Sequence, residues 1–209
     1  MERCPWCGSS PLYTQYHDNE WGVPTADDNR LFEFLLLEGA QAGLSWITIL
    51  KKRENYRAAY HDFDAEKIAR YNQRSVERLL QNPGIVRNRL KVNSSISNAK
   101  LFLDIQQQYG SFAHYLWGFL GDFNGGRPVT NHFSTMAEVP ASTPLSDTIA
   151  REMKKRGFRF FGSTICYAFM QAVGMVNDHL TTCHRHQQCA TIAEHFKTPI
   201  QESGELRSP

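Results

Sequence analysis

The segment of residues 31–53, LFEFLLLEGAQAGLSWITILKKR, carries one acid on an otherwise apolar helix face. Residues that share a helix face recur every three or four positions, and from position 31 this face contains Leu31, Phe34, Leu35, Glu38 and Ala42. A carboxylate that points into a core needs a partner. Two interpretations follow: Glu38 pairs with an arginine and is purely structural, or it is the acid of a ligand pocket beside Trp46.

A second group that could do chemistry lies at the two ends of the sequence. Four of the five cysteines, at positions 4, 7, 183 and 189, lie near histidines, which favours metal binding over disulfides in a reducing compartment. Two cysteines and two histidines could hold one tetrahedral Zn²⁺ with no open coordination position: Cys4, His17, His179 and Cys183. The alternatives are a Cys4-Pro-Trp-Cys7 zinc half-site, a redox C-x-x-C pair, and a loose cluster without metal.

Helix start and stop signals surround the acid. An aspartate pair beginning at Asp27 can cap the start of the first helix, and Gly43 can end it. Ser45 can cap a second helix that closes on the basic residues 51–53. The sequence therefore predicts two helices joined by a sharp turn that exposes Leu44.

A tight turn with basic residues follows in the segment NPGIVRNRLK, residues 82–91. Gly84 frees the backbone in this turn, and the next helix is expected to begin at about Val86 with N–H groups available to an anion. This pattern is typical of a helix-hairpin-helix that holds a DNA phosphate, although a plain helical connector has the same form. Three side chains could support the phosphate contact: Arg87, Arg89 and Lys91.

The remaining pattern predicts an all-α protein without significant β-structure. Helices are expected at 65–71 after Asp64, 76–81 after Ser75, 87–109, 146–156 and 163–174, and residues 121–144 form a long irregular stretch. Residues 1–184 are expected to form one helical domain whose termini one zinc could join. Periodicity is lost after His184, so residues 185–209 are expected to be a flexible tail with at most a short helical turn at 191–196.

Composition excludes few classes of function. The chain has 209 residues, is 41% hydrophobic and carries a formal net charge of +2, which is too small to indicate nucleic-acid binding by itself. No apolar run approaches the roughly 18–20 residues of a membrane span, and the N-terminus lacks a signal-peptide core. We expect a cytoplasmic, monomeric protein with no membrane partner.

Several motifs occur together in one order: Cys4-x-Trp6, YHDNEWGVP (16–24), LEGAQAGLSWITIL (37–50), NPGIVRNRLK (82–91), KKRGFRFFGSTICYAFMQAVGMVNDH (154–179) and Cys183. Over residues 1 to about 184 the chain closely resembles the bacterial 3-methyladenine DNA glycosylase I family. The resemblance implies a helix-hairpin-helix fold, excision of 3-methyladenine from alkylated double-stranded DNA, and one structural zinc on Cys4, His17, His179 and Cys183. The sequence departs from the family at Cys7, His184, His186 and Cys189.

The resemblance also implies a base pocket built from Glu38, Tyr16 and Trp46, with Tyr13 and Trp6 nearby. The chemistry of these residues agrees with that role, because a base must leave the stack to be cut and N3-methyladenine carries a delocalised positive charge. Aromatic faces and a carboxylate attract a cation, with each cation–π contact contributing about 0.5–2 kcal/mol. The alternative interpretation is that these aromatic residues only pack in the hydrophobic core.

Two further expectations concern DNA and the chemical step. DNA is expected to contact two turns, with Leu44 filling the gap left by the flipped nucleotide, through Gly43, Leu44, Gly84, Arg87, Arg89 and Lys91. The cationic base is a good leaving group, so hydrolysis can rest on binding, with water as the nucleophile. The competing classes are a zinc-stapled DNA-binding module without catalysis and a lyase that needs an activated lysine.

Overall fold

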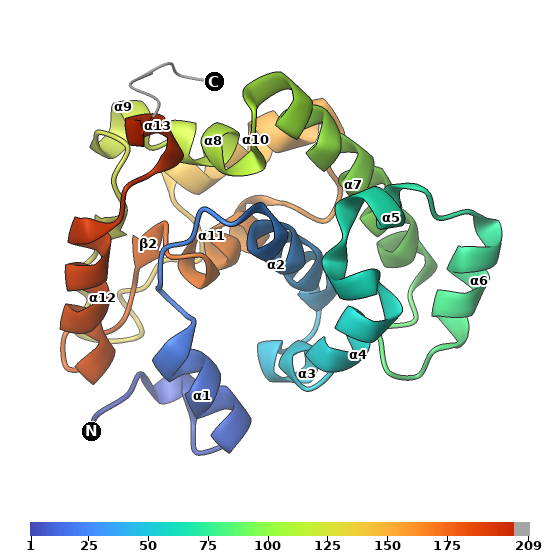
Figure 1. Cartoon of the computed structure of the whole chain (residues 1–209). Helices are drawn as coiled ribbons and strands as arrows, with labels where there is room; N and C mark the ends of the chain where they lie inside the picture. Colours follow the sequence, from blue (N-terminus) through green and yellow to red (C-terminus); the bar gives the residue numbers. More distant parts are fainter. Residues whose placement is uncertain (203–209) are drawn as a thin grey trace.

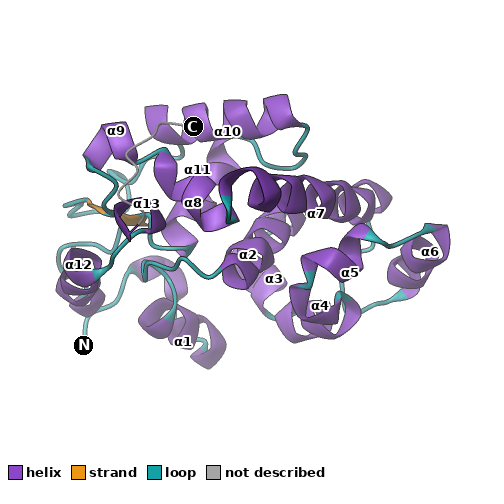
Figure 2. Cartoon of the chain, turned by 45° about the horizontal axis from the view of Figure 1, so that its top comes forward, coloured by secondary structure: helices purple, strands orange, loops and turns teal. Residues whose placement is uncertain are grey.

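The computed structural model describes residues 1–202 and is built almost entirely from helices, as the sequence predicts (Figures 1 and 2). Its only strands in this part are β1 (Val129–Thr130) and β2 (Val176–Asn177), which form one short parallel pair. The α-helices are α1 (Pro11–Asn19), α2 (Asp28–Gln41), α3 (Trp46–Leu50), α4 (Arg53–Ala59), α5 (Ala65–Ala69), α6 (Gln73–Gln81), α7 (Arg89–Tyr109), α8 (Phe112–Gly118), α9 (Gly121–Asn124), α10 (Pro144–Arg156), α11 (Ser163–Ala172), α12 (His184–His195) and α13 (Pro199–Glu202). Two 3₁₀ turns complete the list, η1 (Pro5–Cys7) and η2 (His61–Phe63).

Helix α2 is the centre of the fold. Every residue from Leu31 to Ala40 is buried, which is typical of a helix enclosed on all sides by the core. In Figures 1 and 2, α2 lies between the segment α4–α7 on one side and the helices α8 and α10–α13 on the other. A side chain between Leu31 and Ala40 therefore has no access to solvent unless the packing around it leaves a cavity.

Two aspartates fix the start of α2, in different ways. The carboxylate of Asp27 accepts from the backbone N–H of Arg30 at 2.9 Å, as predicted for a helix cap. Asp28 does not cap α2 as expected, because its carboxylate accepts from the backbone N–H groups of Phe112 and Ala113, both at 2.8 Å. Asp28 therefore joins α2 to the N-terminus of α8, where a negative charge is favourable.

Several predicted helix starts are shifted by two or three residues. Helix α6 begins at Gln73 because Asn72, not Ser75, accepts the capping hydrogen bond. Helix α7 begins at Arg89 rather than near Val86, since the side chain of Asn88 accepts from the N–H of Lys91. Helix α10 begins at Pro144, where Thr143 and Ser146 form a capping box. The capping residue is earlier than expected for α6 and α10 and later than expected for α7.

The prediction of an irregular C-terminal segment is wrong for residues 184–202. Helix α12 spans 12 residues there and α13 follows, with Ile200 only 1% exposed. Helix α12 buries small or polar residues at helical spacing, His186, Cys189 and Ala193, and this pattern has too little hydrophobicity to be recognised in the sequence. Residues 203–209 of the predicted tail lie outside the described residues. No helix in the described part is long and apolar enough to cross a membrane.

Candidate active site and metal cluster

A cavity of about 290 Å³ lies where the N-terminal arm, α2, α3 and α11 meet. Its lining contains all five residues predicted for a base pocket: Trp6, Tyr13, Tyr16, Glu38 and Trp46. These residues come from η1, α1, α2 and α3, so tertiary packing alone brings them together. The volume is at the lower end of the range that is usual for small-molecule sites, roughly 300–1,000 Å³.

Glu38 is buried in this cavity without a partner. Its side chain is 3% exposed, and its Oε2 atom has no hydrogen bond. Among the described residues no arginine or lysine forms an ion pair with Glu38. The arginine predicted by the structural interpretation binds another acid: Arg53 donates to Glu33 at 2.8 Å. The interpretation of Glu38 as one half of a buried ion pair is therefore wrong.

The protonation of Glu38 follows from this isolation. Burial raises the pKa of the Glu38 carboxyl to about 8, because no charge or donor compensates for the loss of water. No described residue donates a hydrogen bond that would keep the Glu38 carboxylate ionised. At neutral pH the empty pocket holds a largely protonated acid that can ionise when a cation arrives.

Aromatic rings surround the acid on several sides. The ring centroids of Tyr16 and Trp46 are 5.4 Å apart, and Trp46 lies 6.2 Å from Phe34 in a stacked arrangement. Trp6 contacts Tyr13 edge to face at 5.1 Å. The indole Nε1 of Trp46 is buried without a hydrogen-bond partner, as is Oε2 of Glu38. Two unpartnered polar atoms in an aromatic cavity are typical of a site that is completed by its ligand.

Sequence reasoning missed eleven of the sixteen residues that line the cavity. The further residues are Trp21, Gln41, Thr164, Tyr167, Ala168, Gln171, Asp178 and four residues of the loop 136–141. A signal for one wall was available, because positions 164, 167, 168 and 171 lie on one face of α11 and three of them are polar. The loop and Asp178 reach the cavity only through the tertiary fold, and no local pattern identifies them.

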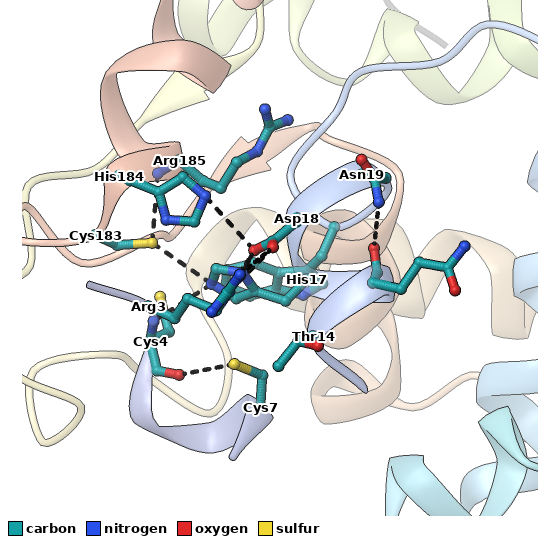
Figure 3. A network of polar contacts seen from close by, with 12 residues as sticks. Arg3, Cys4, Cys7, Thr14, His17, Asp18, Asn19, Cys183, His184 and Arg185 are labelled. Atoms are coloured by element: carbon teal, nitrogen blue, oxygen red, sulfur yellow. Dashed lines mark hydrogen bonds and ion pairs between the residues drawn. The ribbon is translucent and has the colours of Figure 1, made fainter. Parts of the chain in front are cut away.

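The cysteine and histidine residues from the two ends of the sequence form one buried cluster. One ligand atom from each of Cys4, His17, His179 and Cys183 lies within 4.8 Å of all the others. The Sγ atom of Cys183 is 3.5 Å from His17 Nε2 and 3.6 Å from His179 Nδ1, and Cys4 Sγ is 3.6 Å from His179 Nδ1. Figure 3 shows Cys4 and His17 of the N-terminal arm facing Cys183. The prediction that these four residues meet is confirmed.

Neighbouring groups orient the two imidazoles of this cluster. His17 Nδ1 lies 2.8 Å from an Asp18 carboxylate oxygen (Figure 3), and His179 Nε2 lies 3.0 Å from the carbonyl oxygen of Trp21. Each of these contacts leaves the other ring nitrogen facing the two sulfur atoms. Burial lowers the pKa of His179, which keeps this imidazole neutral, as a metal ligand must be.

The departures from the family pattern lie outside the ligand set. The Cys7 thiol donates to the carbonyl oxygen of Cys4 at 3.2 Å (Figure 3), so the alternative half-site of Cys4 and Cys7 is wrong. His184 contacts the carbonyl oxygen of Glu2 through Nδ1 at 2.9 Å, and His186 contacts that of Asn131. Cys189 packs in α12 as a buried free thiol. These side chains support the cluster from outside.

Comparison with known proteins agrees with this geometry. A family model described as methyladenine glycosylase matches residues 6–186. The chain belongs to the methyladenine glycosylase family. Its sequence is 51% identical over 183 residues to DNA-3-methyladenine glycosylase 1 of Escherichia coli, covering 88% of this chain and 96% of that protein. It is 45% identical over 181 residues to the DNA-3-methyladenine glycosylase of Haemophilus influenzae, with coverage of 87% and 96%.

Solved structures of other methyladenine glycosylases superpose on nearly the whole fold. A crystal structure of 3-methyladenine DNA glycosylase I has 54% sequence identity and a TM-score of 0.85, covering 88% of this chain and 100% of that one. The 3-methyladenine DNA glycosylase I from Staphylococcus aureus, solved to explain 3-methyladenine recognition, is 34% identical with a TM-score of 0.84 and coverage of 89% and 97%. The all-α fold with a cluster joining both ends of the sequence is confirmed.

The hairpin of this methyladenine glycosylase differs in detail from the prediction. Gly84 is needed for space and not for a left-handed backbone, because a Cβ there would lie 2.8 Å from Asn55 Cβ and its φ is not positive. The N–H of Gly84 binds Asn82 Oδ1, and that of Val86 binds the hydroxyl of Tyr56. Within residues 82–91 the backbone N–H groups of Arg87, Arg89 and Leu90, just before and at the start of α7, have no partner among the described residues.

The three basic side chains of the hairpin are not equivalent. Arg87 is exposed and has no ion pair among the described residues. Arg89 pairs with Glu77 at 2.8 Å. Lys91 turns inward, and its Nζ donates to the carbonyl oxygens of Ala40 and Ala42, both at 2.7 Å. Lys91 therefore binds the C-terminal end of α2, where a cation is favourable, just before the turn that carries Leu44.

The turn after α2 has the predicted form. Gly43 has φ +80°, a left-handed conformation in which a side chain is strained, and Leu44 follows it with 42% of its surface exposed. Helix α3 begins at Trp46 as predicted, but Ser45 makes no capping hydrogen bond to its backbone. The prediction that this helix closes on residues 51–53 is wrong, because α3 ends at Leu50 and Arg53 belongs to α4. Leu44, the wedge expected to fill the gap in the DNA, therefore lies two residues before Trp46, which belongs to the aromatic wall of the pocket.

Proposed function

We propose that Glu38, Tyr16 and Trp46 bind a flipped 3-methyladenine during its excision from alkylated DNA. The chain is a DNA-3-methyladenine glycosylase, a hydrolase of N-glycosyl bonds that acts in DNA repair. The observation that carries the assignment of residues is the buried, unpartnered Glu38 in an aromatic cavity. A position with only a packing role would not carry such a group, because an unpaired buried acid destabilises the fold.

The pocket fits a cationic purine better than adenine. Tyr16 and Trp46 present ring faces to positive charge, and Tyr13 and Trp6 extend the aromatic wall. Glu38 ionises on contact with the cation and accepts hydrogen bonds from the base edge, which strengthens binding of the charged form. Since the alkylated base is already a good leaving group, binding of this kind and an attacking water suffice for hydrolysis.

An assay on methylated duplex DNA tests this function. Release of free 3-methyladenine with intact abasic strands supports the monofunctional hydrolase. Strand nicking would indicate a lyase, and binding without release would indicate a DNA-binding module. Incubation of a duplex that contains a single 3-methyladenine, followed by separate analysis of the free base and of the strand length, distinguishes the three.

We further propose that the four-residue cluster holds one structural Zn²⁺. Ligands on one tetrahedral zinc, with Zn–S about 2.3 Å and Zn–N about 2.0–2.1 Å, are separated by about 3.5 Å for each sulfur–nitrogen pair. The distances of 3.5 and 3.6 Å between Cys183 or Cys4 and the imidazoles agree with that value. All four positions are filled by protein, so the ion would join the two ends of the sequence and take no part in the reaction.

DNA would be held by the hairpin and opened by the wedge. The unpartnered N–H groups at the start of α7 and the free guanidinium of Arg87 support a phosphate contact. Gly84 allows the close packing that this turn needs, and Arg89 stays paired with Glu77. Lys91 would act indirectly, by fixing the end of α2 from which Gly43 and Leu44 project.

Substitutions of Arg87 and Leu44 should affect different steps. Arg87→Ala should weaken binding to any duplex and reduce the salt dependence of the affinity by about one counterion. Leu44→Ala should keep duplex affinity within about twofold but slow excision from duplex much more than from single strands, because single strands leave no gap to fill. Fluorescence anisotropy measures the duplex affinity, and single-turnover assays measure excision. Ile192→Ala on α12 is the control, because Ile192 is also an exposed aliphatic residue. Equal loss on single and double strands would contradict the wedge role.

We also propose that the enzyme is a monomer whose site is complete within residues 1–184. Every residue assigned to the pocket, the hairpin and the cluster lies in that range, which supports the proposal. Helices α12 and α13 then cover the outside of this domain. Sedimentation equilibrium of the metal-loaded protein, with and without DNA, tests the monomer, and a dimer mass for the free protein would contradict it.

A further inference from the structure

The base pocket contains a second carboxylate that the mechanism has not used. Asp178 follows β2, is 1% exposed, and lines the same cavity as Glu38. These two acids are the only residues with charged side chains among the described residues that line the cavity. No lysine or arginine of the described part forms an ion pair with Asp178. A buried carboxylate without a cation must be stabilised by hydrogen bonds.

Three neutral side chains donate to Asp178. Its Oδ2 atom accepts from the hydroxyl of Tyr167 at 2.6 Å and from Nε2 of Gln171 at 2.8 Å. Its Oδ1 atom accepts from Nδ2 of Asn131 at 2.7 Å. The network leaves both carboxylate oxygens satisfied with no compensating positive charge, so the negative charge remains uncancelled beside the cavity.

The carboxylate also determines which way its neighbours turn. An ionised carboxylate can only accept, so Tyr167 must point its O–H, and Gln171 its NH₂, toward Asp178. Burial, and then the charge of Asp178, raise the pKa of Tyr167 far above its ordinary value of 10, which keeps this proton in place. The side-chain oxygen Oε1 of Gln171 has no hydrogen-bond partner among the described residues, and Gln171 lines the cavity. Tyr167 can therefore offer only acceptor lone pairs to a bound molecule, and Gln171 can offer its Oε1 acceptor as well as its second N–H.

We propose that Asp178 determines the specificity of the pocket for a cationic base, by orienting Tyr167 and Gln171 so that their acceptor atoms stay available to the base and by adding a second negative charge. This inference rests on the proposed base-binding function of the same cavity. A purine cation bears positive charge and amino hydrogens, and acceptor atoms suit both. Neutral adenine offers the same amino group without the charge and gains less from the two carboxylates. Asp178 acts through its neighbours and is a positioning residue.

Asp178→Asn removes the negative charge at nearly constant volume. The new side-chain amide has one oxygen and one NH₂ group, so either Gln171 or Asn131 must turn over its own amide to accept from that group. One negative charge beside the cavity is lost in both arrangements, and where Gln171 turns over a donor also faces the cationic base. A second substitution, Gln171→Glu in the Asp178→Asn background, restores both, since the new carboxylate accepts from Asn and returns the charge.

Two duplexes provide the readout. One contains 3-methyladenine, and the other contains an uncharged isostere in which carbon replaces N3, which can be bound but not cut. Asp178→Asn should slow single-turnover excision of 3-methyladenine at least about tenfold, as expected for loss of one hydrogen bond to a charged group. Affinity for the uncharged isostere should change by less than about threefold, and the double variant should recover excision to within about threefold of wild type.

Other results would overturn the proposal. Unchanged excision by Asp178→Asn, equal losses on the two duplexes, or failure of the double variant to recover would each show that Asp178 is purely structural. If the Asp178→Asn protein has lost its metal or shows no thermal unfolding transition, Gln171→Met is measured in its place. A reduced preference of this variant for the 3-methyladenine duplex over the isostere supports the proposal, and an unchanged preference overturns it. A wild-type protein that releases no 3-methyladenine would contradict the proposed function instead.

Discussion

Replacing Glu38 by glutamine should remove most of the excision activity while raising stability at neutral and alkaline pH. The amide keeps the shape of the side chain but cannot ionise, and it exchanges one acceptor for a donor. Loss of a hydrogen bond to a charged group costs about 1.5–3 kcal/mol, so single-turnover excision of 3-methyladenine should fall by roughly 10- to 100-fold. The same substitution removes a group that the empty pocket cannot satisfy.

The stability effect has a definite pH window. The pKa of Glu38 is raised from 4.5 to about 8 in the folded protein, so between these values the unfolded chain has already lost a proton that the folded chain keeps. Stability therefore falls as pH rises from about 4.5 to about 8, by an amount on the order of 3–5 kcal/mol. The Glu38→Gln protein does not lose stability in this way. Its melting temperature should therefore equal that of the wild type near pH 4.5 and exceed it most at pH 8 and above.

The activity of the wild type should depend on the same ionisation. If the cationic base requires the carboxylate, the excision rate at low substrate concentration should rise with pH up to about 8. The glutamine variant should show a flat profile in this range. Thermal denaturation and single-turnover excision measured on one sample of each protein decide between the roles. A variant that is less stable yet fully active per folded molecule would eliminate Glu38 from the pocket.

Loss of one cluster ligand should have the other large effect. Cys4→Ser or His179→Ala removes a coordinating atom from a buried site that joins the first 17 residues to the end of the core. We expect release of the metal and a loss of several kcal/mol, which for a chain of this size lowers the melting temperature by roughly 10 °C. Metal analysis of the purified protein and calorimetry provide the measurements.

Cys7→Ser is the matched control for this experiment. Cys7 is as buried as Cys4 and only three residues away, but its thiol donates to a carbonyl oxygen and lies outside the cluster. Serine can donate to the same carbonyl, so the control should retain its metal and most of its stability. Purified wild-type protein without zinc, or metal lost from Cys7→Ser but kept by Cys4→Ser, would contradict the ligand set.

The parts of the site that are predictable from sequence have a local signal. Glu38 was identified because it breaks an apolar helix face, and Gly43 with Leu44 because glycine ends a helix. The cluster of Cys4 and Cys183 with two histidines was inferred from residue types at both ends of the sequence. Each of these positions carries a residue type that is costly or unusual in its place, and that cost is visible without a structure.

The remainder depends on partners far away in the sequence. Asp178 resembles any polar residue after a short strand until Tyr167 and Asn131 are seen to donate to it. The inward turn of Lys91 depends on carbonyl groups some 50 residues earlier. Helix α12 was missed because small residues bury little apolar area, so its packing leaves almost no hydrophobic pattern.

The cluster that joins the two ends of the sequence also has a consequence for biosynthesis. Cys4 and His17 leave the ribosome more than 160 positions before His179 and Cys183. Until then the nascent chain holds only half of a coordination sphere, and the aromatic arm that carries Trp6 and Tyr16 cannot be fixed against the core. The wall of the pocket that this arm provides can therefore be fixed only after residue 183 has been translated, when all four side chains of the cluster are present.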